Sequence, residues 1–287
     1  MGNVEEDFLN WLGSLDTSQI KVYGISQGRL VFAKEPLLRV EGPIGILQLL
    51  ETPLLNMINF ASLVCTNAAR MKFIAGENKK CIEFGLRRAQ GPNGAMTASK
   101  YSFLGGFDGT SNVYAGYLYG IPISGTHAHS FVMSFSKESD ITNRILDGVD
   151  LLQKTLAYRS DLGWETTELT ELYAFISYAV SFPNSFLALV DSYSTLNSGV
   201  KNFLLVALAL DDLGYKAVGI RLDSGDLAHL SKEARMMFSQ TAAIYERDFS
   251  KFKIVASNDI NEKSLNDLNE RGHEVDTFGI GTNLVTC

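Results

Sequence analysis

The sequence has few cysteines and few prolines, and each scarcity excludes a class of protein. Its three cysteines are too few and too irregularly spaced to form a disulfide framework, and they favour a reducing compartment. Six prolines beside 25 glycines do not fit a disordered, low-complexity chain. Basic residues are outnumbered as well. The net charge is −7, which argues against a nucleic-acid-binding surface.

Long apolar runs are also missing. The longest uninterrupted run, Phe203 to Leu210, ends at Asp211 and is far shorter than the roughly 20 residues that span a bilayer. The first residues do not form a signal segment, in which positive charge precedes an apolar stretch. We therefore expect a cytoplasmic protein, located in the cytosol, without a membrane partner.

The apolar content, 46% of 287 residues, is enough to bury a large core. Acids alternate with apolar residues over 1–16, which predicts an amphipathic helix. Three short strands are predicted next, at 20–23, 29–32 and 37–40. Residues 1–42 would then belong to a small β-rich domain. Helical spacing predicts connecting helices over 43–82, with Pro53 either opening a second helix or kinking a long one.

From residue 185 onward, predicted strands alternate with predicted helices. The strands are expected at 186–190, 217–222, 252–257 and 275–279, and the helices at 198–213, 227–248 and 260–271. Such repeats build a parallel sheet, either open or closed into a barrel, so we expect an α/β barrel domain over 83–287. In folds of this kind the active site forms at the carboxyl ends of the strands.

Small, acidic or hydroxyl-bearing residues stand at these strand ends. They are Asp191, Asp223-Ser224-Gly225-Asp226, Ser257-Asn258-Asp259 and Gly279-Ile280-Gly281-Thr282. An earlier short strand, 121–124, leads into Gly125-Thr126-His127-Ala128-His129-Ser130. These strand ends together predict a polar rim that carries the chemistry.

His127 and His129 suit proton transfer, metal binding or phosphoryl transfer at neutral pH. The alternative is one hydrogen-bonded structural histidine beside one without a role. A zinc hydrolase would need further histidine ligands from later strands. Only His229 and His273 remain, and neither stands at a predicted strand end, so zinc hydrolysis is the weaker interpretation.

Arg221 is a charged residue inside an otherwise apolar predicted strand, so it needs a partner. An aromatic carboxylate is one candidate, and a structural ion pair with Asp223 or Asp259 is the other. Asp223 itself lies in a tight turn that could present its carboxylate to sugar hydroxyls or to Mg²⁺.

Two stretches are suited to a phosphate group. Gly281 and Thr282 offer backbone N–H groups and a hydroxyl, although a plain turn has the same pattern. Arg87 and Arg88 could grip phosphate with their planar guanidinium groups, or they could lie solvated at the surface.

Six motifs, taken in this order, resemble those of the nicotinate phosphoribosyltransferase family. They are Leu49–Leu55 (LLETPLL), Gly85–Pro92 (GLRRAQGP), Leu104–Asp108 (LGGFD), Gly125–Ser130 (GTHAHS), Arg221–Leu227 (RLDSGDL) and Gly279–Thr282 (GIGT). The resemblance covers nearly the whole chain. It implies an irregular, TIM-like α/β barrel joined to a smaller β-rich domain, in a homodimer with shared active sites.

The same resemblance implies a reaction. Nicotinate would be joined to phosphoribosyl pyrophosphate (PRPP), releasing pyrophosphate and forming nicotinate mononucleotide, the first step of NAD synthesis from nicotinate. ATP, as co-substrate, would be hydrolysed through a phosphohistidine, with Mg²⁺ or Mn²⁺ as the metal.

On this resemblance His129 is the phosphorylated histidine, because it follows the pattern Gly-Thr-x-Ala, and His127 has no role. The implied substrate contacts are Thr126 and Arg221 for nicotinate, Asp223 for the ribose hydroxyls and metal, Gly281 and Thr282 for the 5′-phosphate, and Ser111, Arg87 and Asn258 elsewhere in the site. Ser111 stands where a related nicotinamide enzyme has an acid. A neutral hydroxyl there favours a carboxylate substrate over an amide.

Family members extend beyond both Met1 and Cys287, so the resemblance implies that both domains are incomplete here. An incomplete barrel leaves strand edges and apolar helix faces uncovered, and we expect the isolated chain to be poorly soluble. A rival interpretation is a catalytically silent protein that retains a dimer surface and modulates a full-length partner.

Overall fold

The computed structural model describes residues 4–286 and divides into two compact units, residues 1–63 and 64–287. The division falls within a long helix, α2 (Ile44–Ala75). The predicted sheet and its strand ends all lie in the second unit.

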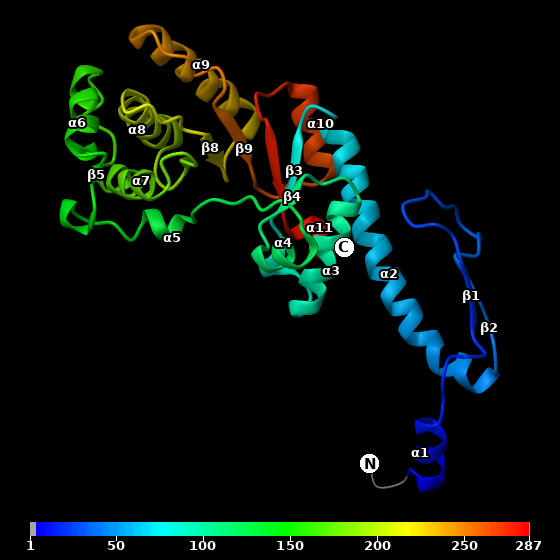
Figure 1. Ribbon diagram of the computed structural model, residues 1–287. Coiled ribbons are helices and arrows are strands. Elements are labelled where there is room, and N and C mark those ends of the chain that lie inside the picture. Colours follow the sequence, from blue (N-terminus) through cyan, green and yellow to red (C-terminus); the bar gives the residue numbers. More distant parts are fainter. Residues whose placement is uncertain (1–3, 287) are drawn as a thin grey trace. The chain divides into compact units, whose positions relative to one another are not determined.

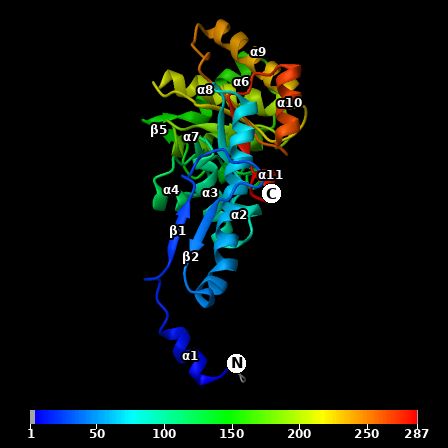
Figure 2. The same cartoon turned by 90° about the vertical axis from the view of Figure 1, so that its right-hand side faces the viewer.

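The first unit contains a short helix and a two-stranded antiparallel hairpin (Figure 2). The helix is α1 (Glu6–Gly13), and the strands are β1 (Lys21–Gly24) and β2 (Leu38–Glu41). Two of the three predicted strands are therefore confirmed. The third prediction, at 29–32, is wrong, because this stretch lies in the loop of the hairpin, where Leu30 is 84% exposed and has no strand to pair with.

Helix α2 is one continuous helix of 32 residues that contains Pro53. Of the two alternatives for this proline, the single long helix is correct. Within residues 4–286, α2 is also the one helix long and apolar enough to cross a membrane, with 11% of its most apolar window buried. Length and composition alone define that criterion, and core helices of soluble proteins also meet it.

The second unit is built on a six-stranded parallel sheet with the order β4-β3-β10-β9-β8-β7 (Figure 1). Its strands are β3 (Lys80–Glu83), β4 (Gly109–Thr110), β7 (Leu187–Leu189), β8 (Gly219–Leu222), β9 (Lys253–Ala256) and β10 (Thr277–Ile280). The four strands predicted after residue 185 are confirmed. Strand β3 was not predicted, and it occupies the end of the stretch for which helices were expected. Only Cys81 and Ile82 of its four residues are apolar, so no apolar run marks this strand in the sequence.

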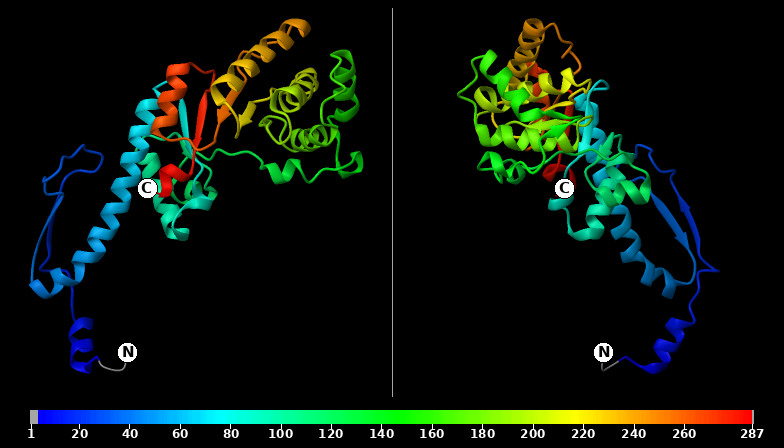
Figure 3. Two further views of the ribbon diagram at one scale, coloured as in Figure 1. Left: turned by 180° about the vertical axis from the view of Figure 1, so that it is seen from behind. Right: turned by 60° about the vertical axis from the view of Figure 1, so that its left-hand side comes forward.

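The second unit also contains helices between and after these strands, and the predicted strand–helix alternation is confirmed. The helices are α3 (Gly91–Leu104), α4 (Val113–Tyr119), α5 (His129–Val132), α6 (Leu151–Asp161), α7 (Leu169–Ser181), α8 (Val200–Asp212), α9 (Leu227–Tyr245), α10 (Glu262–Arg271) and α11 (Thr282–Thr286). Helices α6, α7 and α8 pack on one another, and α8 also contacts α9 (Figure 3). A small hairpin, β5 (Ile145–Leu146) and β6 (Val149–Asp150), precedes α6.

The segment Pro122–His129 contacts both edge strands of the sheet. Beside β4, the N–H of Thr110 donates to the Pro122 carbonyl and the N–H of Ser124 donates to the Thr110 carbonyl, each at 3.0 Å. Beside β7, the N–H of Leu189 donates to an imidazole nitrogen of His127. The α/β architecture is thus as expected, with a six-stranded main-chain ladder and one further segment between its edges.

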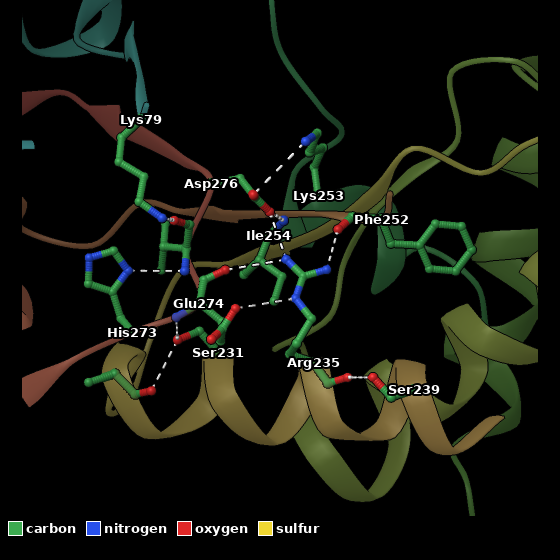
Figure 4. Close-up of polar contacts among 12 residues, drawn as sticks. Lys79, Ser231, Arg235, Ser239, Phe252, Lys253, Ile254, His273, Glu274 and Asp276 are labelled. Carbon is green, nitrogen blue, oxygen red and sulfur yellow. Dashed lines mark hydrogen bonds and ion pairs between the residues drawn. The ribbon is translucent and has the colours of Figure 1, made fainter. Parts of the chain in front are cut away.

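At the amino ends of β9 and β10, one arginine ties α9 to the sheet (Figure 4). Arg235 donates from Nη1 to the Phe252 carbonyl at 2.6 Å and from Nη2 to Asp276 Oδ2 at 2.9 Å. The same Asp276 oxygen accepts the N–H of Ile254 at 2.8 Å. This end of the sheet lies opposite the strand ends where the site was predicted, so these contacts hold the scaffold together.

We expect Arg235→Met to lower the free energy of unfolding by about 1–3 kcal/mol, because it leaves the partly buried Phe252 carbonyl without its donor and Asp276 without its charged partner. Arg70→Met is the control. The Arg70 side chain is 63% exposed and pairs with Glu262, so its loss should cost at most about 1 kcal/mol. Denaturant unfolding measures both, and equal losses would contradict the role assigned to Arg235.

A buried carboxyl group lies between α7 and α8. Glu171 is fully buried, and its Oε2 accepts from Ser198 Oγ at 2.6 Å and from Asn202 Nδ2 at 3.0 Å. Its Oε1 is buried and has no hydrogen-bond partner. Burial raises the pKa of Glu171 to about 7, although both hydrogen bonds oppose the shift.

The folded state therefore holds a proton on Glu171 that the unfolded chain, with a pKa of about 4.3, releases first. The associated stability is fully present below about pH 4.3 and is lost as the pH rises to about 7, by about 3 kcal/mol. Glu171→Gln, which cannot ionise, should abolish this loss. Unfolding midpoints at pH 5 and pH 8 test it, with exposed Glu165→Gln as the control. If the difference between the unfolding midpoints at pH 5 and pH 8 were the same in Glu171→Gln as in the wild type, the assignment would be refuted.

Candidate active site

The site is organised around Asp191, which follows β7 and has a side chain only 1% exposed. Its Oδ1 lies 3.0 Å from His129 Nε2. Its Oδ2 accepts the N–H of Asp223 at 3.1 Å and the hydroxyl of Ser224 at 2.5 Å. A buried carboxylate is stable only when its oxygens are satisfied, and here they are satisfied by residues from two other chain segments.

His129 begins α5 and keeps 40% of its side chain exposed. A carboxylate can only accept, so the Asp191 contact assigns the proton of the neutral ring to Nε2. The lone pair then lies on Nδ1. An imidazole with one nitrogen fixed by a carboxylate and a free lone pair on the other is arranged as a nucleophile or base.

His127, two residues earlier, lies in a different environment. Its Nε2 accepts the N–H of Leu189 at 3.2 Å, and its ring contacts Tyr178 edge-on, with 4.7 Å between the centroids. Burial, together with the positive charges of Arg221 and His129, lowers the pKa of His127 to about 4. His127 is therefore neutral at pH 7. Its hydrogen bond to the backbone matches the structural histidine of the two alternatives considered for the pair.

Arg221 of β8 is held by three side chains. It donates from Nε to Ser257 Oγ at 2.7 Å, from Nη1 to Thr126 Oγ1 at 3.3 Å and from Nη2 to Asp223 Oδ1 at 2.9 Å. The ion pair with Asp223, one of the two alternatives considered, is present. These three bonds use three of the five guanidinium N–H donors, which leaves two for a ligand.

Phe84 was not singled out from the sequence, although it also belongs to this cluster. Its ring centroid lies 5.2 Å from Arg221 Cζ. A Cβ atom at Gly279 would lie 2.4 Å from this ring, and one at Gly281 would lie 3.1 Å from the Phe84 carbonyl oxygen. The glycines of the Gly-Ile-Gly-Thr motif thus let β10 approach Phe84, a function that the motif alone did not reveal.

Glu83, the last residue of β3, is the second buried acid of the site. Its carboxylate accepts from Ser99 Oγ at 2.9 Å, from Thr110 Oγ1 at 2.5 Å and from the N–H of Gly85. Its carbonyl accepts the N–H of Ser111 at 2.8 Å. Glu83 therefore links the turn that leads to Arg87 with the backbone of Ser111.

The remaining predicted residues lie at the rim of the site. Arg87, Asn258 and Thr282 are exposed, whereas Gly281 is partly buried. The Arg87 turn (Leu86–Arg88) contacts α11, which begins at Thr282, so the two stretches proposed for phosphate are neighbours. Neither Arg87 nor Arg88 forms an ion pair within the described residues.

Comparison with known proteins gives a consistent result. The family model for the nicotinate phosphoribosyltransferase N-terminal domain matches residues 1–59, and the model for the nicotinate phosphoribosyltransferase family matches residues 79–287. Nicotinate phosphoribosyltransferase 1 of Arabidopsis thaliana is 56% identical over 299 residues, which cover 99% of this chain and 54% of that protein. The human enzyme is 48% identical, with 98% and 55% covered.

A crystal structure of the human nicotinic acid phosphoribosyltransferase has the same fold, with a TM-score of 0.89 and 46% identity. It covers 97% of this chain, which in turn covers 58% of the human chain. The chain spans about half the length of the curated relatives it matches. Since the second family model alone matches more than half of the residues, the chain belongs to the nicotinate phosphoribosyltransferase family.

Proposed function

We propose that the protein transfers the phosphoribosyl group of PRPP to nicotinate, and that ATP hydrolysis through a phosphohistidine at His129 drives the reaction. Pyrophosphate leaves as the ring nitrogen of nicotinate bonds to the ribose, giving nicotinate mononucleotide. The observation that carries the proposal is the shared anchoring of His129 and Arg221. Both side chains are held by carboxylates at adjacent strand ends, and each retains unused hydrogen-bonding capacity.

Nicotinate is bound, on this proposal, by its carboxylate and by its flat ring. The two free N–H donors of Arg221 suit a carboxylate, and Thr126 lies beside them. The Phe84 ring next to the guanidinium offers a surface for stacking an aromatic ring. Ser111 adds no negative charge, which suits an acid better than an amide substrate.

The chemistry at His129 requires a free nitrogen and a fixed ring. Nδ1 has its lone pair free to attack the terminal phosphate of ATP, forming an N–P bond as ADP leaves. The Nε2–H group of His129 stays hydrogen-bonded to the Asp191 carboxylate. The negative charge of this carboxylate stabilises the positive charge that develops on the ring. The exposed face of His129 allows the nucleotide to approach.

The metal is proposed to arrive with the phosphate substrates. Among the residues that the structure describes, no group of three or more His, Cys, Asp or Glu side chains is arranged to hold an ion. Mg²⁺ is typically held by one or two carboxylates together with substrate phosphates, and Asp223 is the carboxylate available here. Bound Mg²⁺ or Mn²⁺ would neutralise charge on the leaving pyrophosphate.

The phosphate and ribose of PRPP are proposed to be bound by residues at the rim of the site, which are Gly281, Thr282, Arg87 and Asn258. We also propose that the protein is located in the cytosol and forms a homodimer in which the two chains share active sites.

Incubation of the full-length protein with γ-labelled ATP should label His129. We expect His129→Asn to reduce the acid-labile label to background, because an amide nitrogen has no lone pair available for phosphoryl transfer. His273→Asn is the control, since this histidine lies before β10 at the opposite end of the sheet. A label lost in His127→Asn but kept in His129→Asn would reverse the assignment. If the 287-residue chain is neither labelled nor active while the full-length protein is both, the result favours the catalytically silent protein.

Arg221→Lys should weaken nicotinate binding by about 10- to 100-fold and PRPP binding much less, because Lys cannot form the paired contact with a carboxylate. Arg87→Lys is the reciprocal variant and should weaken PRPP more than nicotinate. Equilibrium binding of each substrate separates the two effects. If Arg221→Lys weakened both substrates equally, Arg221 would have a structural role only.

A further inference from the structure

The two histidines of the Gly-Thr-His-Ala-His-Ser motif contact the last residue of β7 and a residue just after it. His127 Nε2 accepts the N–H of Leu189, and His129 Nε2 lies 3.0 Å from Asp191 Oδ1. In both contacts the partner lies 62 positions further along the chain. The constant offset means that residues 127–129 run parallel to residues 189–191.

Strand β7 is an edge strand, and this explains why its outer side needs a partner. The N–H of Val190 donates to the Arg221 carbonyl on the β8 side. Neighbouring N–H groups along a strand point to opposite sides, so that of Leu189 points away from the sheet. Without His127 this buried donor would be unsatisfied, at a cost comparable to a lost hydrogen bond.

The contacts of His127 favour one form of its ring. An Nε2 that accepts the Leu189 N–H has no proton, so the proton of the neutral ring lies on Nδ1. Nδ1 is shielded from solvent and has no hydrogen-bond partner. The rings of Phe131, Phe175 and Tyr178 surround the imidazole, with centroids 4.7–6.0 Å away. His127 is therefore built in as an acceptor.

We propose that His127 is a positioning residue that sets the register of this motif against β7 and thereby places His129 on Asp191. The His127 imidazole takes the place of a main-chain hydrogen-bond partner on the outer side of this edge strand. The inference rests on the proposed function of His129 as phosphoryl acceptor. It adds a role for a histidine that the substrates would not touch.

The register matters because residues two apart in an extended segment lie on the same side, about 6.6–6.8 Å apart. The His127 contact therefore fixes the height at which His129 meets Asp191. Loss of the first contact frees the segment to slide, and a displacement of about 1 Å in a reacting group can cost roughly 100-fold in rate. The neighbouring Thr126, which contacts Arg221 at 3.3 Å, would shift as well.

The test compares His127→Leu with His127→Gln. Leucine fills the space among the aromatic rings and removes the acceptor, whereas the glutamine oxygen can reach the position of Nε2. His273→Leu is the matched control, because His273 Nδ1 likewise accepts a backbone N–H, that of Val275 at 3.0 Å, far from the site. Two measurements are made on the full-length protein: imidazole ¹⁵N NMR with selectively labelled histidine, and labelling of His129 by γ-labelled ATP.

In the wild type, we expect opposite tautomers for the two rings, with the proton on Nδ1 of His127 and on Nε2 of His129. His127→Leu should lose the Nε2–H preference of His129 and lower its labelling rate by about 10- to 100-fold. His127→Gln and His273→Leu should retain both.

Equal tautomers in the wild type would overturn the proposal even if His127→Leu did not fold. So would a His127→Leu protein in which His129 keeps its tautomer and its labelling rate. If the NMR results follow the expectation while no form is labelled, the proposed phosphoryl transfer fails and the positioning role of His127 stands.

Discussion

The site depends on one buried negative charge. The Asp191 carboxylate is almost completely removed from water, so its position is determined by the groups that satisfy its oxygens. These are the His129 ring, the N–H of Asp223 and the Ser224 hydroxyl, which belong to the motif after residue 124 and to the turn after β8. One aspartate thereby holds together two motifs that lie nearly 100 positions apart in the sequence.

A second set of contacts radiates from the turn after β8. The backbone N–H of Asp223 donates to the Asp191 carboxylate, which holds Asp223 in place. The Oδ1 atom of Asp223 then accepts from both Arg221 and Ser257. Arg221 in turn reaches Thr126, which lies two residues after the end of the predicted strand 121–124. Arg221 and His129 are thus connected through the hydrogen bonds of Asp223 and Asp191. The spacing between the guanidinium group and the imidazole is therefore set before any substrate binds. Preorganisation of this kind reduces the ordering that substrate binding must otherwise accomplish.

Much of the scaffold could be predicted from local patterns. The four strands of the regular half are apolar runs with a helix of clear 3.6-residue period after each of the first three, and such patterns survive in almost any packing. The strands β3 and β4 could not be predicted this way, because β3 has only two apolar residues between Lys80 and Glu83 and β4 consists of Gly109 and Thr110. Arg29 to Phe32 shows the opposite failure. Its composition suits a strand, but the hairpin pairs 21–24 with 38–41 and leaves it in the loop.

The sequence by itself determined the parallel α/β class, the family, and the residue types that meet at the strand ends, because motif order and periodicity are properties of the chain. Only the tertiary structure decided which partner each side chain takes. Asp191 looked like one polar strand end among four, Phe84 and Glu83 stood in no recognisable chemical pattern, and His127 looked like a variable position. Phe84 matters because its ring lies beside the Arg221 guanidinium, Asp191 and Glu83 because their carboxyl groups are buried, and His127 because it meets an unpaired strand edge. These relations arise only when distant segments come together.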